Sequence, residues 1–234
     1  MLPKLATPKY DMIVPSTGKV ISYRPYVVKE EKILLIAMES QNENEIEKAV
    51  LNIIKECIES PINVDELTSF DVEFIFITLR SQSVGEGIKL LPKCQHCEEP
   101  NEVTLNLDKI IVANLEDAID MHVKLTDDIS IDLKWHTMKE KTALVGKKDS
   151  ETETVIGLIS TGIETIYSGE DIHAAKDSTN EELIDFVESL NTDQFNDIVK
   201  ILANAPHLSY DLKFDCKECS KENSIALKGL VDFF

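Results

Sequence analysis

Two stretches of the sequence decide the fold: LPKCQHCEEPNEV (residues 91–103) and KFDCKECSKENSI (residues 213–225). Each contains a Cys-x-x-Cys pair, Cys94 with Cys97 in the first and Cys216 with Cys219 in the second. An apolar, extended segment precedes each pair and an alternating segment follows it, which predicts a strand, a tight turn and a return strand. Each stretch therefore has the pattern of half a zinc ribbon, and the four thiolates can surround one Zn²⁺ tetrahedrally.

A zinc site made of these four cysteines would be structural. Four thiolates fill the coordination shell of Zn²⁺ and leave no position for water or substrate. Short hairpins bury too little apolar surface to be stable alone, and a four-thiolate site contributes about 10 kcal/mol or more to folding. The site would also join two parts of the chain that residues 98–215 separate.

Other interpretations of the cysteines remain open at this point. A redox pair of the thioredoxin type lies at the start of a helix, where the helix dipole lowers the thiol pKa, whereas both pairs here lie between predicted strands. In a second alternative, the four cysteines are free thiols without a metal. In a third, His96 replaces one thiolate as a metal ligand. The flanking strands favour the four-cysteine zinc site, with His96 at the solvated tip of its turn.

The composition limits the partners that the protein can bind. Of 234 residues, 24 are basic and 43 are acidic, and the net charge is −19. Nucleic acids and anionic membranes both require a basic surface on the protein, so the charge argues against either partner. It fits a protein that contacts a basic protein surface.

The sequence also predicts the compartment. The longest apolar run, Ile33–Met38, is far shorter than a membrane span. The first residues lack the apolar core of a signal peptide, so we expect a cytosolic origin. In the cytosol a Cys-x-x-Cys pair indicates metal or redox chemistry rather than a structural disulfide.

Residues 1–91 are predicted to form a β-hairpin followed by helices. Two alternating segments flank the turn sequence Pro15–Gly18 and predict the hairpin. One helix starts near Lys29, and Ser69 is predicted to cap another. Between them, apolar residues from Ile46 to Cys57 recur at helical spacing. Cys57 lies on this stripe and is therefore predicted to be a core residue rather than a nucleophile.

Residues 109–206 are predicted to be an inserted region with one hairpin and several helices. Alternating segments on either side of Thr126–Asp128 predict the hairpin. A mostly helical stretch is expected from Thr137 to about Tyr167, with a possible break in the polar run Lys147–Thr154. Two capped helices are expected to follow, one starting near Ser178 or Thr179 and the other near Asn191 or Thr192.

The predicted fold class is α+β, with an N-terminal hairpin plus helices, a split zinc-ribbon-like β element and a mixed, mainly helical insertion. The predicted domains are residues 1–91, the split element 92–108 with 207–234, and the insertion 109–206. The terminal Phe233 and Phe234 are expected to pack against the zinc hairpin. The alternative is an aromatic hook that inserts into a partner's pocket.

No pattern in the sequence indicates a catalytic site. There is no phosphate-binding loop, because Gly146 is followed by lysines without the rest of the motif. The histidines are scattered and have no motif partner, and the zinc-deaminase signature is missing. We therefore expect a protein that is not an enzyme.

Several segments together resemble the baseplate hub assembly proteins of contractile-tailed, T-even-like bacteriophages. These segments are PKLATPKYDMIVPSTGKVISYRPYVVKEEKILLIAMES (residues 3–40), SFDVEFIFITLRSQSVGE (residues 69–86), the two Cys-x-x-Cys pairs and the terminal DFF. The resemblance covers most of the chain, is strongest in residues 3–105 and at the C-terminus, and is weak in residues 109–205.

The resemblance implies a non-enzymatic phage protein that helps to build the central hub of the tail baseplate. Its partners would be other hub or tail proteins, and it would lie in the virion tail, in the host cytoplasm during assembly, or in both. The residues that carry over are Cys94, Cys97, Cys216 and Cys219, and no catalytic residue does. A zinc-ribbon nucleic-acid-binding protein is the alternative, and the acidic charge opposes it.

Overall fold

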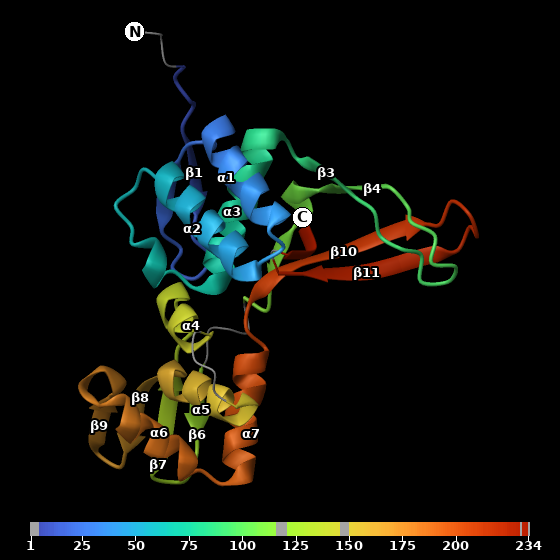
Figure 1. Ribbon diagram of the computed structural model, residues 1–234. Coiled ribbons are helices and arrows are strands. Elements are labelled where there is room, and N and C mark those ends of the chain that lie inside the picture. The colour runs from blue at the N-terminus through green and yellow to red at the C-terminus, as the bar shows by residue number, and fades with distance from the viewer. Residues whose placement is uncertain (1–4, 116–120, 146–149, 230, 234) are drawn as a thin grey trace. The chain divides into compact units, whose positions relative to one another are not determined.

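The computed structural model of the chain describes residues 5–115, 121–145, 150–229 and 231–233. Helices and small antiparallel sheets are interspersed along the chain, so the fold class is α+β, as predicted (Figure 1). The chain forms two compact units. The first comprises Met1–Val64, Phe70–Ala113 and His207–Phe234, and the second comprises Asp65–Ser69 and Asn114–Pro206.

The first unit begins with the predicted hairpin. Strands β1 (Tyr10–Ile13) and β2 (Val20–Tyr23) pair antiparallel. The turn between them is fixed to the start of helix α3 (Ser69–Val84), where the carboxylate of Asp71 accepts hydrogen bonds from the backbone N–H and the hydroxyl of Ser16 at 2.9 and 2.5 Å. Because Asp71 is fully buried, these bonds replace the water that its carboxylate has lost.

Two further helices, α1 (Val28–Glu39) and α2 (Glu43–Cys57), lie between this hairpin and α3 in the sequence. The side chain of Asn42 caps α2 by accepting hydrogen bonds from two backbone N–H groups of its first turn. The apolar stripe predicted for α2 is buried from Ala49 to Cys57. Cys57 has no exposed surface and is a core residue, as predicted.

Two longer hairpins extend from the helical part of the first unit (Figure 1). Strand β3 (Gly87–Leu90) pairs with β4 (Val103–Asn106), and β10 (His207–Asp215) pairs with β11 (Glu222–Lys228). The short strand β5 (Ile111–Ala113), which the sequence did not predict, pairs with the other edge of β10. Because β5 and β10 are neighbours, the chain leaves the first unit and returns to it at adjacent strands. Short 3₁₀ turns lie at Val64–Glu66, Leu107–Lys109 and Val231–Phe233.

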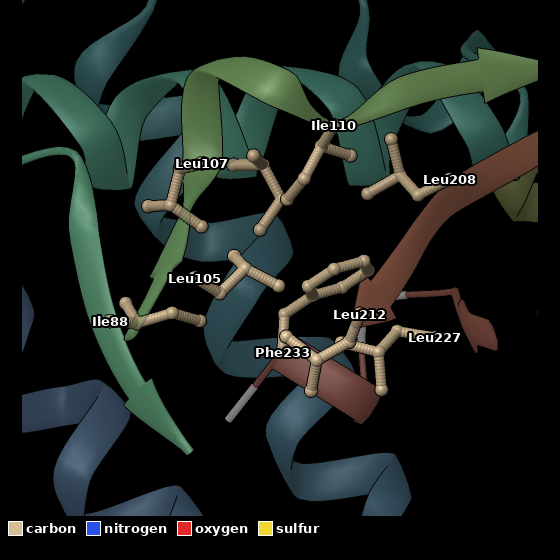
Figure 2. Close-up of a cluster of buried hydrophobic side chains, with 9 residues drawn as sticks. Ile88, Leu105, Leu107, Ile110, Leu208, Leu212, Leu227 and Phe233 are labelled. Carbon is tan, nitrogen blue, oxygen red and sulfur yellow. The ribbon is translucent and has the colours of Figure 1, made fainter. Parts of the chain in front are cut away.

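The bases of these hairpins share one hydrophobic core (Figure 2). Ile88 and Leu105 of the first hairpin pack with Leu212 and Leu227 of the second. Phe233 has no exposed surface and lies in the same cluster. The C-terminal tail therefore packs against the hairpins, as predicted, and Phe233 is no exposed hook. Phe234 lies outside the described residues.

The second unit contains a four-stranded antiparallel sheet in the order β6-β7-β8-β9. Its strands are β6 (His122–Lys124), β7 (Ile129–Leu133), β8 (Ile163–Ser168) and β9 (Asp171–Ala174). The other elements are α4 (Met138–Val145), α5 (Glu151–Gly162), the 3₁₀ turn Ala175–Asp177, α6 (Asn180–Glu188) and α7 (Thr192–Ala203). Ile131 of the sheet and Ile159 and Ile198 of the helices are fully buried in the core of this unit.

The second unit confirms some predictions and corrects one. The β6–β7 hairpin and the caps Thr179 and Asn191 are as expected. The helical stretch expected to reach Tyr167 is wrong at its end, because α5 stops at Gly162 and the chain continues as β8, paired with β7. The expected polar break Lys147–Thr154 is only partly right, because its residues Glu151–Thr154 form the start of α5. Residues 147–149 lie outside the described part of the chain.

Candidate metal centre

The four predicted cysteines meet at the tips of the two hairpins of the first unit. Cys94 and Cys97 follow β3, and Cys216 and Cys219 lie between β10 and β11. All four Sγ atoms lie within 4.8 Å of one another. In the described part of the chain, no other group of three or more His, Cys, Asp or Glu side chains lies close enough to hold a metal ion.

The spacing of the sulfur atoms fits a tetrahedral metal site. Two separations run between the pairs, 3.7 Å from Cys94 to Cys219 and 3.6 Å from Cys97 to Cys216. A tetrahedron with metal–sulfur bonds of about 2.3 Å has edges of about 3.8 Å. A disulfide needs sulfur atoms about 2.05 Å apart, so these pairs are separate thiols. The residues present therefore fit a four-thiolate Zn²⁺ site.

Each Cys-x-x-Cys pair forms a tight turn, which we call the first knuckle (residues 94–99) and the second knuckle (residues 216–221). The backbone N–H groups of Cys94 and Cys216 donate to the carbonyls five residues later, at 2.9 Å in both knuckles. The residue after the second cysteine, Glu98 or Ser220, has a positive φ of 61° or 55°. The two knuckles therefore repeat the same backbone conformation. A positive φ is strained for a residue other than glycine, so the surrounding tertiary structure holds Glu98 and Ser220 in this conformation.

Backbone N–H groups point at the buried sulfur atoms. The N–H of His96 donates to Sγ of Cys94 at 3.4 Å. Burial raises the pKa of the Cys94 thiol, but the N–H groups of His96 and Cys97 outweigh this effect and lower the pKa to about 6. The N–H of Cys219 likewise lowers the pKa of Cys216. Both buried cysteines are therefore prepared to be thiolates, which is the form that binds metal.

The pKa of the more exposed Cys97 reflects the repulsion between neighbouring sulfur atoms when no cation is present. The backbone N–H of Glu99 lowers its pKa, but burial and the sulfur atoms of Cys216, Cys219 and Cys94 together raise it to about 12. A divalent cation at the centre removes this repulsion and allows all four sulfur atoms to be ionised. The electrostatics of the cluster therefore favour a metal ion.

Two asparagines that the sequence analysis missed complete the site. Asn101 and Asn223 each stand four residues after the second cysteine of their knuckle, and each is 1% exposed. Oδ1 of Asn223 accepts a hydrogen bond from the N–H of Gln95 in the first knuckle, at 2.8 Å. Oδ1 of Asn101 accepts one from the N–H of Lys217 in the second knuckle, at 2.9 Å. The signal was present as a repeated Cys-x-x-Cys-x-x-x-Asn.

The remaining candidates take no part in the cluster. The ring of His96 is exposed, and its Nε2 lies 3.4 Å from the carbonyl of Glu222 rather than among the sulfur atoms. Burial raises the pKa of Cys57 to about 11, which keeps this core thiol protonated and unreactive at neutral pH. Four thiolates leave a metal no open position, so a metal bound here would hold structure and would not activate a substrate.

Comparison with known proteins identifies the family. The family described as T4 bacteriophage base plate protein matches residues 7–234. The chain belongs to this family. It is 26% identical over 228 residues to a protein of Enterobacteria phage T4 named baseplate hub assembly protein gp26, and the alignment covers 97% of both chains.

The match confirms the resemblance that the sequence segments indicated and supports a phage baseplate role. No solved structure matches the chain significantly. None of the described helices is long and apolar enough to cross a membrane.

Proposed function

We propose that the chain is a structural or assembly protein of the central hub of a phage tail baseplate. It would act through contacts with other hub and tail proteins, without catalysis, in the host cytoplasm during assembly, in the virion tail, or in both. The observation that carries this proposal is the similarity to the T4 hub assembly protein over 97% of both chains. An alignment of this extent includes the sequence of both units rather than one motif.

In this proposal the four cysteines hold one structural Zn²⁺. Residues 92–108 and 207–234 then form a split zinc ribbon, with residues 109–206 inserted between its halves. The support is the sulfur spacing of 3.6–3.7 Å between knuckles and the backbone N–H groups directed at the sulfur atoms. Metal binding would fix the positions of two hairpin tips that are far apart in sequence, and a fixed surface suits a protein that acts by docking.

The charge distribution favours basic partner surfaces. The second unit contains 22 acidic and 8 basic residues, whereas the first contains 21 and 16. Most of the net charge of −19 therefore lies in the second unit. An acidic surface of this kind speeds association with a basic protein surface and opposes association with a second acidic copy.

Co-expression with the hub and tail proteins of the same phage, followed by affinity purification, tests the proposed function. The chain is expected to retain at least one hub protein, and less of it as salt rises. The same purification can compare two variants. Cys216→Ser removes a cysteine of the cluster, and Cys57→Ser is its matched control, because Cys57 lies outside the cluster. Failure to retain any hub or tail protein at low and moderate salt would overturn the proposal, whereas binding of duplex DNA or RNA in a gel shift would favour the nucleic-acid alternative.

A further inference from the structure

Asn101 and Asn223 occupy equivalent positions in the two halves of the cysteine site, and each contacts the opposite half. The bond from Gln95 to Asn223 joins residues 128 positions apart, and the bond from Lys217 to Asn101 joins residues 116 positions apart. The two donors directly follow Cys94 and Cys216 in the chain. Each asparagine therefore fixes the backbone beside a candidate metal ligand of the other half.

Each asparagine is held in place by its own half. Nδ2 of Asn101 donates to the carbonyl of Glu99 at 2.8 Å, and Nδ2 of Asn223 donates to the carbonyl of Lys221 at 2.9 Å. A carbonyl can only accept and a backbone N–H can only donate, so these partners fix which end of each amide faces the other half. Both ends of both buried amides are thus used, which is the condition for burying them at low cost.

Asn101 has one contact that Asn223 lacks among the described hydrogen bonds. Its Nδ2 lies 3.6 Å from Sγ of Cys216, within the range of a hydrogen bond to sulfur. Such a bond withdraws negative charge from a thiolate and orients its lone pairs. The two asparagines therefore share a positioning role, and Asn101 additionally affects one sulfur atom.

We propose that Asn101 and Asn223 are reciprocal positioning residues of the metal site, each holding the opposite knuckle so that the four sulfur atoms stand at tetrahedral spacing before the metal arrives. This inference rests on the proposed metal site. Groups that orient metal ligands in this way typically change metal affinity by about 10–100-fold. The alternative is that the asparagines only join two hairpins and leave metal binding unchanged.

The test uses the full chain and two probes, Zn²⁺ affinity by competition with a chelator and the absorption spectrum of the Co²⁺-substituted protein. Asn101→Ala and Asn223→Ala are each expected to weaken Zn²⁺ binding by about 10-fold or more. Both are expected to keep the intense visible bands of tetrahedral Co²⁺, since the four ligands remain. Of the two variants, Asn101→Ala alone should shift the sulfur-to-cobalt charge-transfer band, because Asn101 is the one of the two asparagines whose described hydrogen bonds include a sulfur atom.

Asn191→Ala is the matched control, because Asn191 caps α7 in the second unit, whereas the cysteine cluster belongs to the first. It should lower thermal stability without changing Zn²⁺ affinity or the Co²⁺ spectrum. Asn101→Ser and Asn223→Ser remove the same bonds with a smaller loss of packing and carry the test where an alanine variant does not fold.

Two outcomes separate this inference from the proposed site. Wild-type Zn²⁺ affinity in folded variants of both asparagines would overturn the positioning role and leave the metal site intact. A wild-type protein that binds neither Zn²⁺ nor Co²⁺ would overturn the metal site and the positioning role together.

Discussion

The Sγ atoms of Cys97 and Cys216 lie 3.6 Å apart, although 119 positions of sequence separate the two residues. Closing a loop of this length costs conformational entropy, which contacts elsewhere must offset. The hydrophobic core at the bases of the hairpins and the asparagine bonds at their tips provide such contacts. The proposed metal would add a cross-link through coordination bonds where the hairpin tips meet.

Removal of the metal should open the hairpin tips before the core. Under chelation, amide hydrogen exchange is expected to rise in residues 93–101 and 215–223, where hydrogen bonds join the knuckles. Residues around Leu105 and Leu212 should stay protected longer, because both are buried in the core of Figure 2. Equal exchange at the tips with and without chelator would argue against a bound metal.

Cys216→Ser should destabilise the protein more than Cys57→Ser. A serine at position 216 removes one of four ligands, and the lost metal is expected to lower the free energy of unfolding by about 3 kcal/mol or more. A serine at position 57 buries a hydroxyl in the core and should cost about 1–3 kcal/mol. In thermal melts, chelator should lower the midpoint of Cys57→Ser and leave Cys216→Ser unchanged. The opposite pattern would place the metal elsewhere.

Acid should destabilise the first unit through Glu30. This carboxylate is 2% exposed and lies 2.9 Å from Nη2 of Arg24. Burial raises the pKa of Glu30, but the hydrogen bonds from Arg24 and from the N–H of Val27 outweigh burial and lower it. A lowered folded-state pKa gives stability that is complete above the unfolded pKa of about 4.3 and is lost as pH falls through the folded value.

Urea unfolding of the wild type between pH 7 and pH 3 measures this loss. Glu30→Gln should cost about 1–3 kcal/mol at pH 7, because Arg24 loses its charged hydrogen-bond partner, and the cost should shrink at acid pH. Glu45→Gln, at an exposed position of α2, is the matched control and should change the free energy of unfolding little. A pH-independent effect of Glu30→Gln would show that the ion pair is not the source.

The C-terminal tail should be essential for stability. Phe233 has no exposed surface and lies in the cluster with Leu105 and Leu212 (Figure 2). Phe233→Ala is expected to lower the free energy of unfolding by about 3–5 kcal/mol. Leu91→Ala, whose side chain is 69% exposed, should have little effect in the same denaturation experiment. Near-wild-type stability of Phe233→Ala would mean that the tail does not pack as described.

The sequence predicted the elements whose signals are local. The β1–β2 and β6–β7 hairpins, the apolar stripe of α2 and the caps of α6 and α7 all follow from short patterns. Strand β8 was missed because Ile156, Ile159, Ile163 and Ile166 continue a helical spacing of three and four across Gly162. The choice of strand comes from pairing with β7, which is a tertiary contact.

The features of the fold and of the site that were missed depend on long-range contacts. Strand β5 has three residues, and within the described residues its partner is β10, far along the chain, so no local pattern marks it. The clustering of the four cysteines was predictable, because two Cys-x-x-Cys pairs between strands are the spacing typical of a metal site. Asn101 and Asn223 were not singled out, because a buried asparagine and a surface-turn asparagine look alike until the opposite knuckle is in place.

Native mass spectrometry of freshly purified protein tests the central claim most directly. A four-cysteine Zn²⁺ site predicts one zinc per folded chain, held without added metal and lost in Cys216→Ser but not in Cys57→Ser. A wild-type mass equal to that of the metal-free chain, with the four thiols of the cluster free in a folded protein, would contradict it.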